Sequence, residues 1–283
     1  MPGITGKVCL EMPIFGTSAA EQAVRWGALR FEVNAPGSYS AGGLTPSLAD
    51  LRIVTELGVP LRVMIRPRGP PSEGRDFIYS EEEFSQMERD ILQFRKSGLL
   101  EKERGDGFVF GILEENTDTQ ETGATTQRCW VDVQRCARLV KAARPFTSVF
   151  HRAFDEIVSS SGGCEDEDPG SWNKALKDVT SCGFSAILTS GGLGKAIQNV
   201  ETLQNICREA DPLCMEIIVG GGVRKINVSE LVEKLNLGTE PWDVFVHSAC
   251  LSGQPSEEVD QDEVQGIVSQ LQQPDRYSLS SGR

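Results

Sequence analysis

Short apolar segments alternate with amphipathic ones along most of the chain. The apolar segments are rich in β-branched and aromatic residues and lack a regular polar face, which is typical of parallel strands buried on both sides. Eight such strands are predicted, at residues 7–12, 28–33, 61–65, 108–113, 146–150, 184–188, 215–219 and 244–246.

Helical periodicity fills the intervals between these strands. The predicted helices lie at residues 18–26, 45–57, 81–97, 130–143, 172–182, 195–208, 228–235 and 262–271. Two of them carry start signals. Thr45 is placed to cap one helix with Pro46 in its first turn, and Ser80 with Glu83 can form a capping box at another.

This alternation predicts an α/β fold, the TIM (β/α)8 barrel. Eight β/α units within about 250 residues are typical of that fold. A doubly wound open sheet is the alternative, but no break into two halves and no interdomain linker are visible. We therefore expect a single domain over residues 1–283, with its core at about 7–272.

The predicted connections differ in length at the two ends of the strands. Links from helix to strand are short, as at 58–60, whereas the links at 66–79, 114–129 and 151–171 follow strands and are longer. In TIM barrels the face at the carboxyl ends of the strands carries the active site. We expect the site there, and interpret the acidic Ser/Gly-rich run 159–170 as a tolerated insertion.

Composition narrows the class of partner. The formal net charge is −13, which excludes broad binding to nucleic acid or to an anionic membrane surface. No apolar run approaches the roughly 18 residues of a membrane span, and no secretory signal is visible. The eight cysteines form no CxxC pair and no zinc-finger spacing. We expect a cytoplasmic protein with reduced thiols, as a monomer or as a homo-oligomer.

Polar and charged residues gather where the predicted strands end. One of the chain's two histidines, His151, stands beside Arg152 and Asp155 after the fifth strand. Such a cluster is typical of a functional site, with a structural ion pair as the alternative interpretation. The candidate acid/base residues are Glu32, His151 and Asp155. The candidate ligand-binding residues are Glu11, Arg66, Arg68, Arg152, Ser190, Gly191, Gly221, Arg224 and His247.

Side-chain alternation predicts which way Glu32 points. Glu32 shares a face of its strand with Arg30 and Asn34, whereas Phe31 and Val33 lie on the other face. The apolar pair should pack against helices, so Glu32 should face the lumen of the barrel.

Glycine-rich turns follow the sixth and seventh strands. Backbone amides near Gly191 and Gly221 can approach an anion, and Arg224 can add a bidentate contact. Four arginines at strand ends stand against three carboxylates, which favours a small phosphate- or carboxylate-bearing molecule. The arginines are Arg66, Arg68, Arg152 and Arg224, and the carboxylates are Glu11, Glu32 and Asp155. No lysine at a strand end supports Schiff-base chemistry.

Several short motifs, in order, resemble the CutC family of copper homeostasis proteins. They are Gly42-Gly43-Leu44-Thr45-Pro46-Ser47, Met64-Ile65-Arg66-Pro67-Arg68-Gly69, Asp76-Phe77-Ile78-Tyr79-Ser80, Phe150-His151-Arg152-Ala153-Phe154-Asp155, Leu188-Thr189-Ser190-Gly191, Gly220-Gly221-Gly222-Val223 and Val246-His247-Ser248-Ala249. The resemblance covers roughly residues 8–250. It implies a TIM barrel and a cytosolic protein with a role in copper tolerance through Cu(I) binding.

The chain departs from the family at the positions of its proposed soft ligands. Where the family often has cysteine after the first two strand glutamates, this chain has Pro13, Ile14 and Asn34. Because Cu(I) prefers thiolate and thioether ligands, we expect weak Cu(I) affinity. We expect Cys9, which shares a strand face with Glu11, to be packed one layer deeper.

Three functional hypotheses follow. The first is a copper homeostasis protein that binds a copper ion. The second is a TIM-barrel enzyme acting on a small anionic metabolite by general acid/base chemistry. The third is a binding module whose ancestral site is no longer used. Copper(I) as a cofactor is suggested by the family resemblance only.

Overall fold

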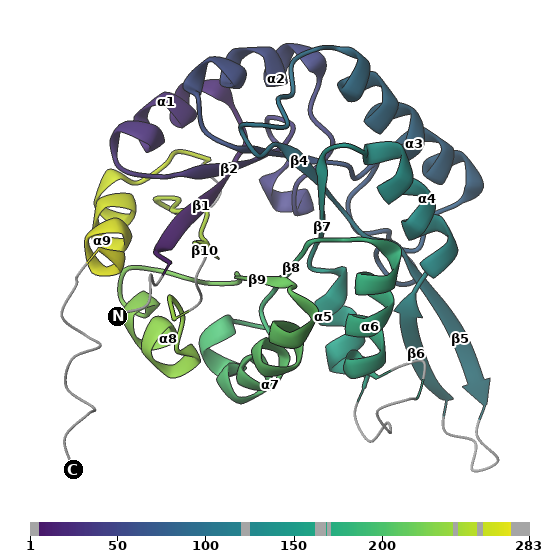
Figure 1. Cartoon of the computed structure of the whole chain (residues 1–283). Coiled ribbons are helices and arrows are strands. Elements are labelled where there is room, and N and C mark those ends of the chain that lie inside the picture. Colours follow the sequence, from purple (N-terminus) through teal and green to yellow (C-terminus); the bar gives the residue numbers. More distant parts are fainter. Residues whose placement is uncertain are drawn as a thin grey trace, which may run out of the picture.

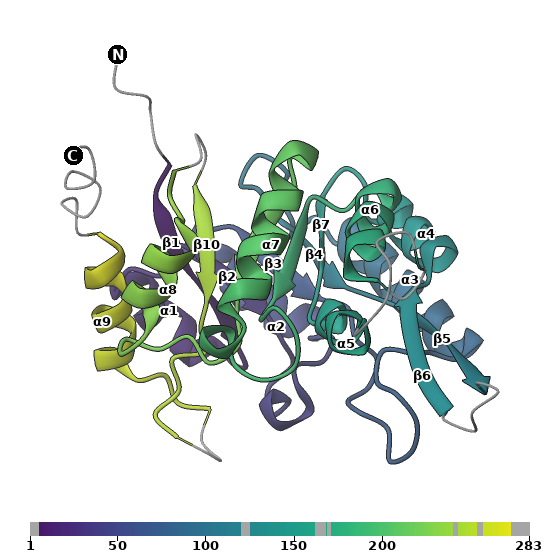
Figure 2. The same cartoon turned by 90° about the horizontal axis from the view of Figure 1, so that it is seen from below.

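The computed structural model describes residues 6–119, 125–161, 168, 171–239, 243–253 and 257–272. Eight parallel strands close into a barrel in the order β1-β10-β9-β8-β7-β4-β3-β2, with helices around it (Figures 1 and 2). The strands are β1 (Val8–Ile14), β2 (Arg30–Val33), β3 (Leu61–Met64), β4 (Gly107–Phe110), β7 (Thr147–Phe150), β8 (Ala186–Thr189), β9 (Glu216–Val219) and β10 (Val244–His247). The predicted TIM barrel is confirmed.

The helices follow the predicted order, with amphipathic faces turned to the barrel. They are α1 (Thr17–Arg25), α2 (Leu48–Val54), α3 (Glu81–Lys96), α4 (Val133–Ala143), α6 (Trp172–Cys182), α7 (Val200–Ala210), α8 (Val228–Leu235) and α9 (Gln261–Leu271). The capping box of Ser80 and Glu83 at α3 is confirmed. The predicted cap at Thr45 is wrong, because Ser47 caps α2 in a capping box with Asp50. Thr45 Oγ1 instead accepts a hydrogen bond from the backbone of Arg66, at 2.8 Å.

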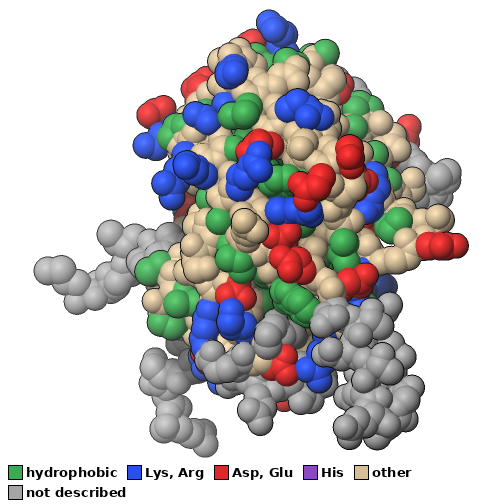
Figure 3. All heavy atoms as spheres, turned by 90° about the vertical axis from the view of Figure 1, so that its right-hand side faces the viewer, with side chains coloured by type: hydrophobic (Ala, Val, Ile, Leu, Met, Phe, Trp, Pro, Cys, Tyr) green, Lys and Arg blue, Asp and Glu red, His purple; other side chains and the backbone are tan. Residues whose placement is uncertain are grey.

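Two elements lie where loops were predicted. Helix α5 (Ala153–Ser160) starts two residues after His151, in the interval expected to be loop. An antiparallel hairpin of β5 (Leu113–Thr119) and β6 (Thr125–Val131) occupies the interval after β4 and projects from the helical ring (Figures 1 and 2). On the side of the molecule seen in Figure 3, basic and acidic side chains are interspersed, with no continuous basic patch.

The apolar core has two parts. The larger part lies between the barrel and its helices and includes Phe31, Phe108 and Phe150. The smaller part fills the lumen. It consists of Met64, Val109, Val149, Ala186, Leu188 and Ile218, with Phe245 packed against it. Inward-facing layers of this kind make the barrel a packed core rather than a pore.

A buried cluster of charged side chains lies in the lumen beside these apolar side chains. The guanidinium of Arg30 lies 3.5 Å from the ring centroid of Phe245 and forms ion pairs with both Glu11 and Glu216. Cys9 shares a face of β1 with Glu11 and is buried. Burial raises the pKa of its thiol to about 11. This matches the expected deeper position of Cys9. None of the helices in the described ranges is long and apolar enough to cross a membrane.

Candidate functional site

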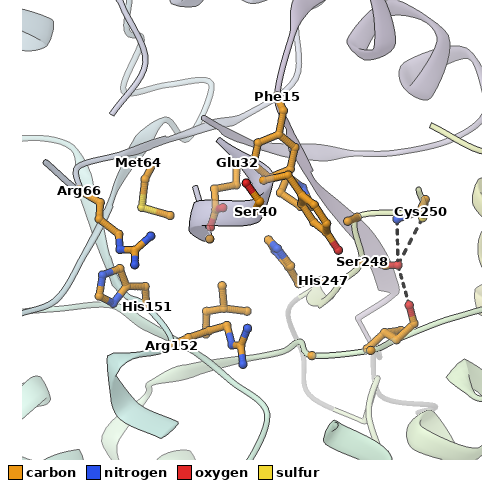
Figure 4. Close-up of a pocket in the computed structure, with 18 of the residues that line it drawn as sticks. Phe15, Glu32, Ser40, Met64, Arg66, His151, Arg152, His247, Ser248 and Cys250 are labelled. Carbon is orange, nitrogen blue, oxygen red and sulfur yellow. Dashed lines mark hydrogen bonds between the residues drawn. The ribbon is translucent and has the colours of Figure 1, made fainter. Parts of the chain in front are cut away.

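A cavity of about 560 Å³ opens at the carboxyl ends of the barrel strands (Figure 4). Seven of the predicted site residues line it: Glu32, Arg66, His151, Arg152, Gly221, Arg224 and His247. They come from β2, β10 and the segments after β3, β7 and β9, far apart in the sequence. Closure of the barrel brings them together, as the strand-end argument predicted.

Glu11 lies beneath the cavity rather than in its wall. Its Oε1 lies 2.7 Å from Nδ1 of His247, and its Oε2 pairs with Arg30. Burial favours the neutral form of Glu11, but Arg30 and His247 outweigh it and lower the pKa of this carboxyl to about 2. Glu11 is therefore a fixed anion that orients His247.

His247 is the cationic histidine of the cavity. Burial opposes its protonation, but the hydrogen bond with Glu11 and the negative charges of Glu32 and Glu11 raise its pKa above the ordinary value. With Nδ1 facing Glu11, the opposite edge of the imidazolium is left for the cavity that His247 lines. This side chain suits the binding of an anionic group.

Glu32 faces the lumen, as alternation predicted, and is almost completely buried. Its Oε1 accepts a hydrogen bond from Asn34 Nδ2 at 3.1 Å, whereas its Oε2 has no partner within the described part of the chain. Burial is the largest influence and raises the pKa of Glu32, assisted by the charge of Glu11. A carboxyl with a raised pKa and one free oxygen is suited to proton transfer.

The side chain of Asn34 occupies space that a nearby glycine leaves open. Gly43 has φ +86°, and a Cβ at this position would lie 2.2 Å from Asn34 Oδ1. A side chain here would displace the amide that positions Glu32. Part of the Gly42-Gly43 motif therefore serves the carboxyl group of the cavity.

His151 is buried and neutral. Its Nδ1 accepts a hydrogen bond from the backbone N–H of Ala153 at 3.3 Å, and its Nε2 has no partner among the residues described. Burial lowers its pKa to about 3, with contributions from the positive charges of Arg66 and Arg152. The pKa values of the two histidines of the cavity are therefore shifted in opposite directions.

Arg66 is buried and held rigidly at the cavity wall. It donates to the backbone oxygens of Ala41 and Gly43 and forms an ion pair of 2.7 Å with Asp76. Its Nε has no partner within the described ranges. The Phe77 ring lies under the guanidinium, with its centroid 5.2 Å away. These contacts hold the guanidinium as a preorganised cation of the cavity wall.

Arg152 and Arg224 are the more exposed cations of the cavity. Arg152 pairs with Asp155 at 3.3 Å, yet about half of its side chain is exposed to solvent. Arg224 pairs with Glu263 at 3.1 Å and donates to the backbone oxygen of Leu251. Of the two, Arg152 is the more available for an entering anion.

Asp155 does not line the cavity. It accepts hydrogen bonds from Thr189 Oγ1 at 2.6 Å, from both the amide and the hydroxyl of Ser190, and from the amide of Gly192 at 3.3 Å. The Gly191 amide donates to Thr189 Oγ1 at 2.9 Å. The turn after β8 is thus closed on a protein carboxylate, and its amides are used internally.

Four of the predicted ligand-binding residues differ in whether they line the cavity. Ser190 and Gly191 belong to that turn and are not in the cavity wall, whereas Gly221 is. Arg68 lies outside the cavity, where it pairs with Glu83 at 2.6 Å and with Asp76 at 3.6 Å. The geometry therefore places Arg66, Arg152 and His247 in the cavity wall and leaves the turn at Gly191 outside it.

The cavity also contains residues that sequence reasoning did not single out. Aromatic rings of Phe15, Tyr39 and Phe77 line it, together with Met64 and Cys250. Phe15 and Tyr39 meet edge to face, with centroids 5.2 Å apart. Apart from Met64 at the end of β3, these residues lie outside the strands and α-helices, so periodicity gave no signal for them. Met64 and Phe77 were visible only as members of family motifs.

The soft metal donors of the cavity are few. Met64 offers a thioether and Cys250 a thiol, and burial raises the pKa of the Cys250 thiol to about 11. Across the described ranges, no group of three or more His, Cys, Asp or Glu side chains is arranged to hold a metal ion. The donor set fits Cu(I) poorly, because Cu(I) prefers thiolates.

Comparisons with known proteins agree on one family. The model of the CutC family matches residues 7–240. A copper homeostasis protein cutC homolog from Caenorhabditis elegans is 31% identical over 229 residues, covering 80% of this chain and 76% of the relative. The Homo sapiens homolog is 30% identical over 232 residues, covering 82% of this chain and 71% of the relative. A CutC crystal structure from Streptococcus agalactiae has a TM-score of 0.64 at 24% identity, covering 84% of this chain and 97% of that one.

Proposed function

This chain belongs to the CutC family, and from that premise we propose that it acts in copper homeostasis as a cytoplasmic protein. The support is the name of the Caenorhabditis elegans and Homo sapiens relatives, both called copper homeostasis proteins. The motifs that carry the resemblance surround the cavity, since Arg66, His151, Gly221 and His247 all line it. The family motifs of this chain therefore meet at this cavity.

Direct copper coordination in the cavity is the weaker part of this function. Two imidazoles, one thioether and one protonated thiol line the cavity, together with three arginines and the carboxyl group of Glu32. One of the imidazoles, His247, already carries a proton through its contact with Glu11. A cation would have to displace that proton in a wall that also presents Arg66 and Arg152.

The geometry favours a second function for the cavity: acid/base chemistry on a small anionic molecule. The observation that carries it is the Glu32 carboxyl, which is buried and has one oxygen without a partner among the described residues, in a cavity that three arginines also line. Cations attract a phosphate or carboxylate, and a carboxyl with a raised pKa transfers protons near neutral pH. Aromatic walls give the ligand an apolar contact.

Paired titrations separate the two functions. Cu(I) is titrated in competition with bicinchoninate under anaerobic conditions, and thermal unfolding is followed with added inorganic phosphate at constant ionic strength. Cu(I) binding at one equivalent that outcompetes the chelator supports metal binding in the cavity. Stabilisation by phosphate without tight Cu(I) binding supports the anion site. Neither response would favour a binding module whose site is no longer used.

A further inference from the structure

We propose that the cavity catalyses proton transfer at a carbon beside the carbonyl group of a small anionic substrate, with Glu32 as the base and His151 as a neutral hydrogen-bond donor to the carbonyl oxygen. The substrate class is a ketone or 2-oxo acid that carries a phosphate or a carboxylate. This inference rests on the acid/base function proposed above and specifies its reaction.

The tautomer of His151 follows from its backbone contact. Ala153 is the first residue of α5, and its N–H donates to Nδ1 of His151 at 3.3 Å. A nitrogen that accepts a hydrogen bond carries no proton, so the single proton of the neutral imidazole is on Nε2. His151 lines the cavity, and this Nε2–H has no protein partner in the described part of the chain.

The surroundings of His151 keep the imidazole neutral. The amino end of α5 points at the ring and carries partial positive charge, and Arg66 and Arg152 lie nearby. A neutral imidazole of this kind polarises a carbonyl oxygen without first giving up its proton, as the histidine of triosephosphate isomerase does. Packing on the Phe77 ring, at 4.6 Å between centroids, holds the ring in place.

Glu32 supplies the complementary group. Asn34 occupies its Oε1, which leaves Oε2 as the atom that can receive a proton. Figure 4 shows Glu32, His151 and His247 on different sides of one opening, with Arg66 and Arg152 at its edge. A substrate within the cavity is therefore bounded by one carboxyl group and several donors, a division of roles that enolisation requires.

The step balances without an oxidant or a metal. The Glu32 carboxylate takes a proton from the carbon beside the carbonyl. The electron pair of the broken C–H bond forms a C=C bond, and the carbonyl π pair moves onto oxygen. The resulting enolate oxygen is stabilised by the Nε2–H of His151, while Arg66, Arg152 and His247 hold the anionic group. Return of the proton to the same carbon gives an exchanged product. Where that carbon bears a hydroxyl group, its hydroxyl proton passes to the enolate oxygen, the former C–OH becomes the new carbonyl group, and the proton on Glu32 returns to the former carbonyl carbon to give an isomerised product.

Hydrogen exchange in D₂O tests the step without knowledge of the natural substrate. Dihydroxyacetone phosphate is the probe for substrates that carry a phosphate, and 2-oxobutyrate is the probe for substrates that carry a carboxylate. ¹H NMR follows the loss of the protons on the carbon beside the carbonyl group. The wild-type protein should accelerate exchange of at least one probe. Glu32→Gln should reduce the rate by roughly 10²-fold or more. His151→Leu should do the same, whereas His151→Gln, which keeps a neutral N–H donor, should retain a measurable part.

Glu88→Gln is the matched control, because Glu88 forms a surface ion pair with Arg138 away from the cavity. This variant should catalyse hydrogen exchange at the wild-type rate. If Glu32→Gln is inactive after the same purification, a co-purified enzyme is excluded as the source of the activity. Thermal shifts with the same probes distinguish a failure of the enolisation step from a failure of the anion site. Stabilisation by a probe without exchange overturns the enolisation step and leaves the anion site standing. Neither stabilisation nor exchange with either probe overturns both.

Discussion

Nδ1 of His247 lies 2.7 Å from Oε1 of Glu11, which itself is paired with Arg30 in the lumen of the barrel. This contact raises the pKa of His247, whereas His151, on the other side of the cavity, accepts a backbone hydrogen bond and its pKa is lowered to about 3. Since the chain has only two histidines, the opposite shifts can be read directly from two sets of imidazole signals.

We predict that the two imidazoles titrate far apart. His247 should stay protonated above pH 6.5, and His151 should remain neutral down to about pH 3. Glu11→Gln removes the negative charge that helps to hold the proton on His247, so the pKa of His247 should fall. Long-range ¹H–¹⁵N spectra across pH report both rings. Two imidazoles that titrate together near pH 6.5 would contradict this assignment.

The buried neutral His151 should also make the protein less stable in mild acid. Its folded pKa of about 3 lies below the unfolded value of 6.5, so the unfolded state binds more protons between these values. Stability should fall as pH decreases from 6.5, by up to ~1.4 kcal/mol per pH unit. The charges that face His151 are Arg66 and Arg152, and neither titrates in this range.

Urea unfolding of the wild type and of His151→Gln at pH 7.0, 6.0 and 5.0 isolates this contribution, since the amide does not titrate. The variant should lose less stability than the wild type over this interval. Below pH 4.5 both proteins should weaken further, because the unfolded state protonates Glu11 at its ordinary pKa of 4.5, whereas the folded state keeps this carboxyl ionised down to a pKa of about 2. Equal slopes above pH 5 for both proteins would show that His151 is accessible to protons in the folded state.

The sequence predicts the barrel well because its signals are local. Alternation alone placed Glu32 in the lumen, and each strand end needed only a short apolar run followed by a polar group. The missed hairpin has a different character. The strand Leu113–Thr119 is polar and acidic, so its pattern is that of a loop, and only pairing with β6 makes it a strand. Such pairing is not encoded within either segment.

Helix α5 and the role of Asp155 also could not be predicted from local sequence signals. The helix has eight residues and no side-chain cap at Arg152, so it lacks the start signals that mark α3. Asp155 was a reasonable acid/base candidate as a carboxylate after a strand. Its actual contacts are with Thr189 and Ser190, 34 and 35 positions later in the chain. Whether a carboxylate faces a ligand or a turn depends on that distant partner.

Anion binding should depend on Arg152 more than on the arginines with complete protein contacts. Phosphate should raise the melting temperature of the wild type, and Arg152→Ala should remove most of the increase. Arg68→Ala is the matched control, because Arg68 is paired with Glu83 and Asp76 outside the cavity. Arg224→Ala should have a smaller effect than Arg152→Ala, since Glu263 and Leu251 already engage its guanidinium. Equal losses in the Arg152 and Arg68 variants would assign the effect to general surface charge.

Cu(I) affinity should be weak. Cys250 in the cavity wall and Cys9 deeper in the barrel are both protonated at neutral pH, since burial raises the pKa of each thiol to about 11. Binding would have to release those protons and gather ligands that are not clustered. In anaerobic competition with bicinchoninate, the chelator should retain the metal. Stoichiometric binding that is lost in Cys9→Ser or in Cys250→Ser would overturn this expectation and identify the ligand.

Replacing the proposed base should stabilise the protein. The pKa of Glu32 is raised above its ordinary 4.5, chiefly by burial, so the folded state holds this proton more tightly than the unfolded state does. Stability is therefore fully present below pH 4.5 and is lost as pH rises through the folded pKa. Glu11, His247 and Arg152 are the charged groups that act on it, and burial together with Glu11 prevails.

Glu32→Gln keeps the size of the side chain and the contact with Asn34 but cannot ionise. Its unfolding free energy should exceed that of the wild type at pH 8, by on the order of 1 kcal/mol. The difference should shrink towards zero at pH 4, where the wild-type carboxyl is also neutral. A group retained at a cost in stability at neutral pH is expected where its charge serves a reaction. Urea unfolding at both pH values measures the difference, and a variant less stable than the wild type at pH 8 would mean that Glu32 is a structural anion rather than a base.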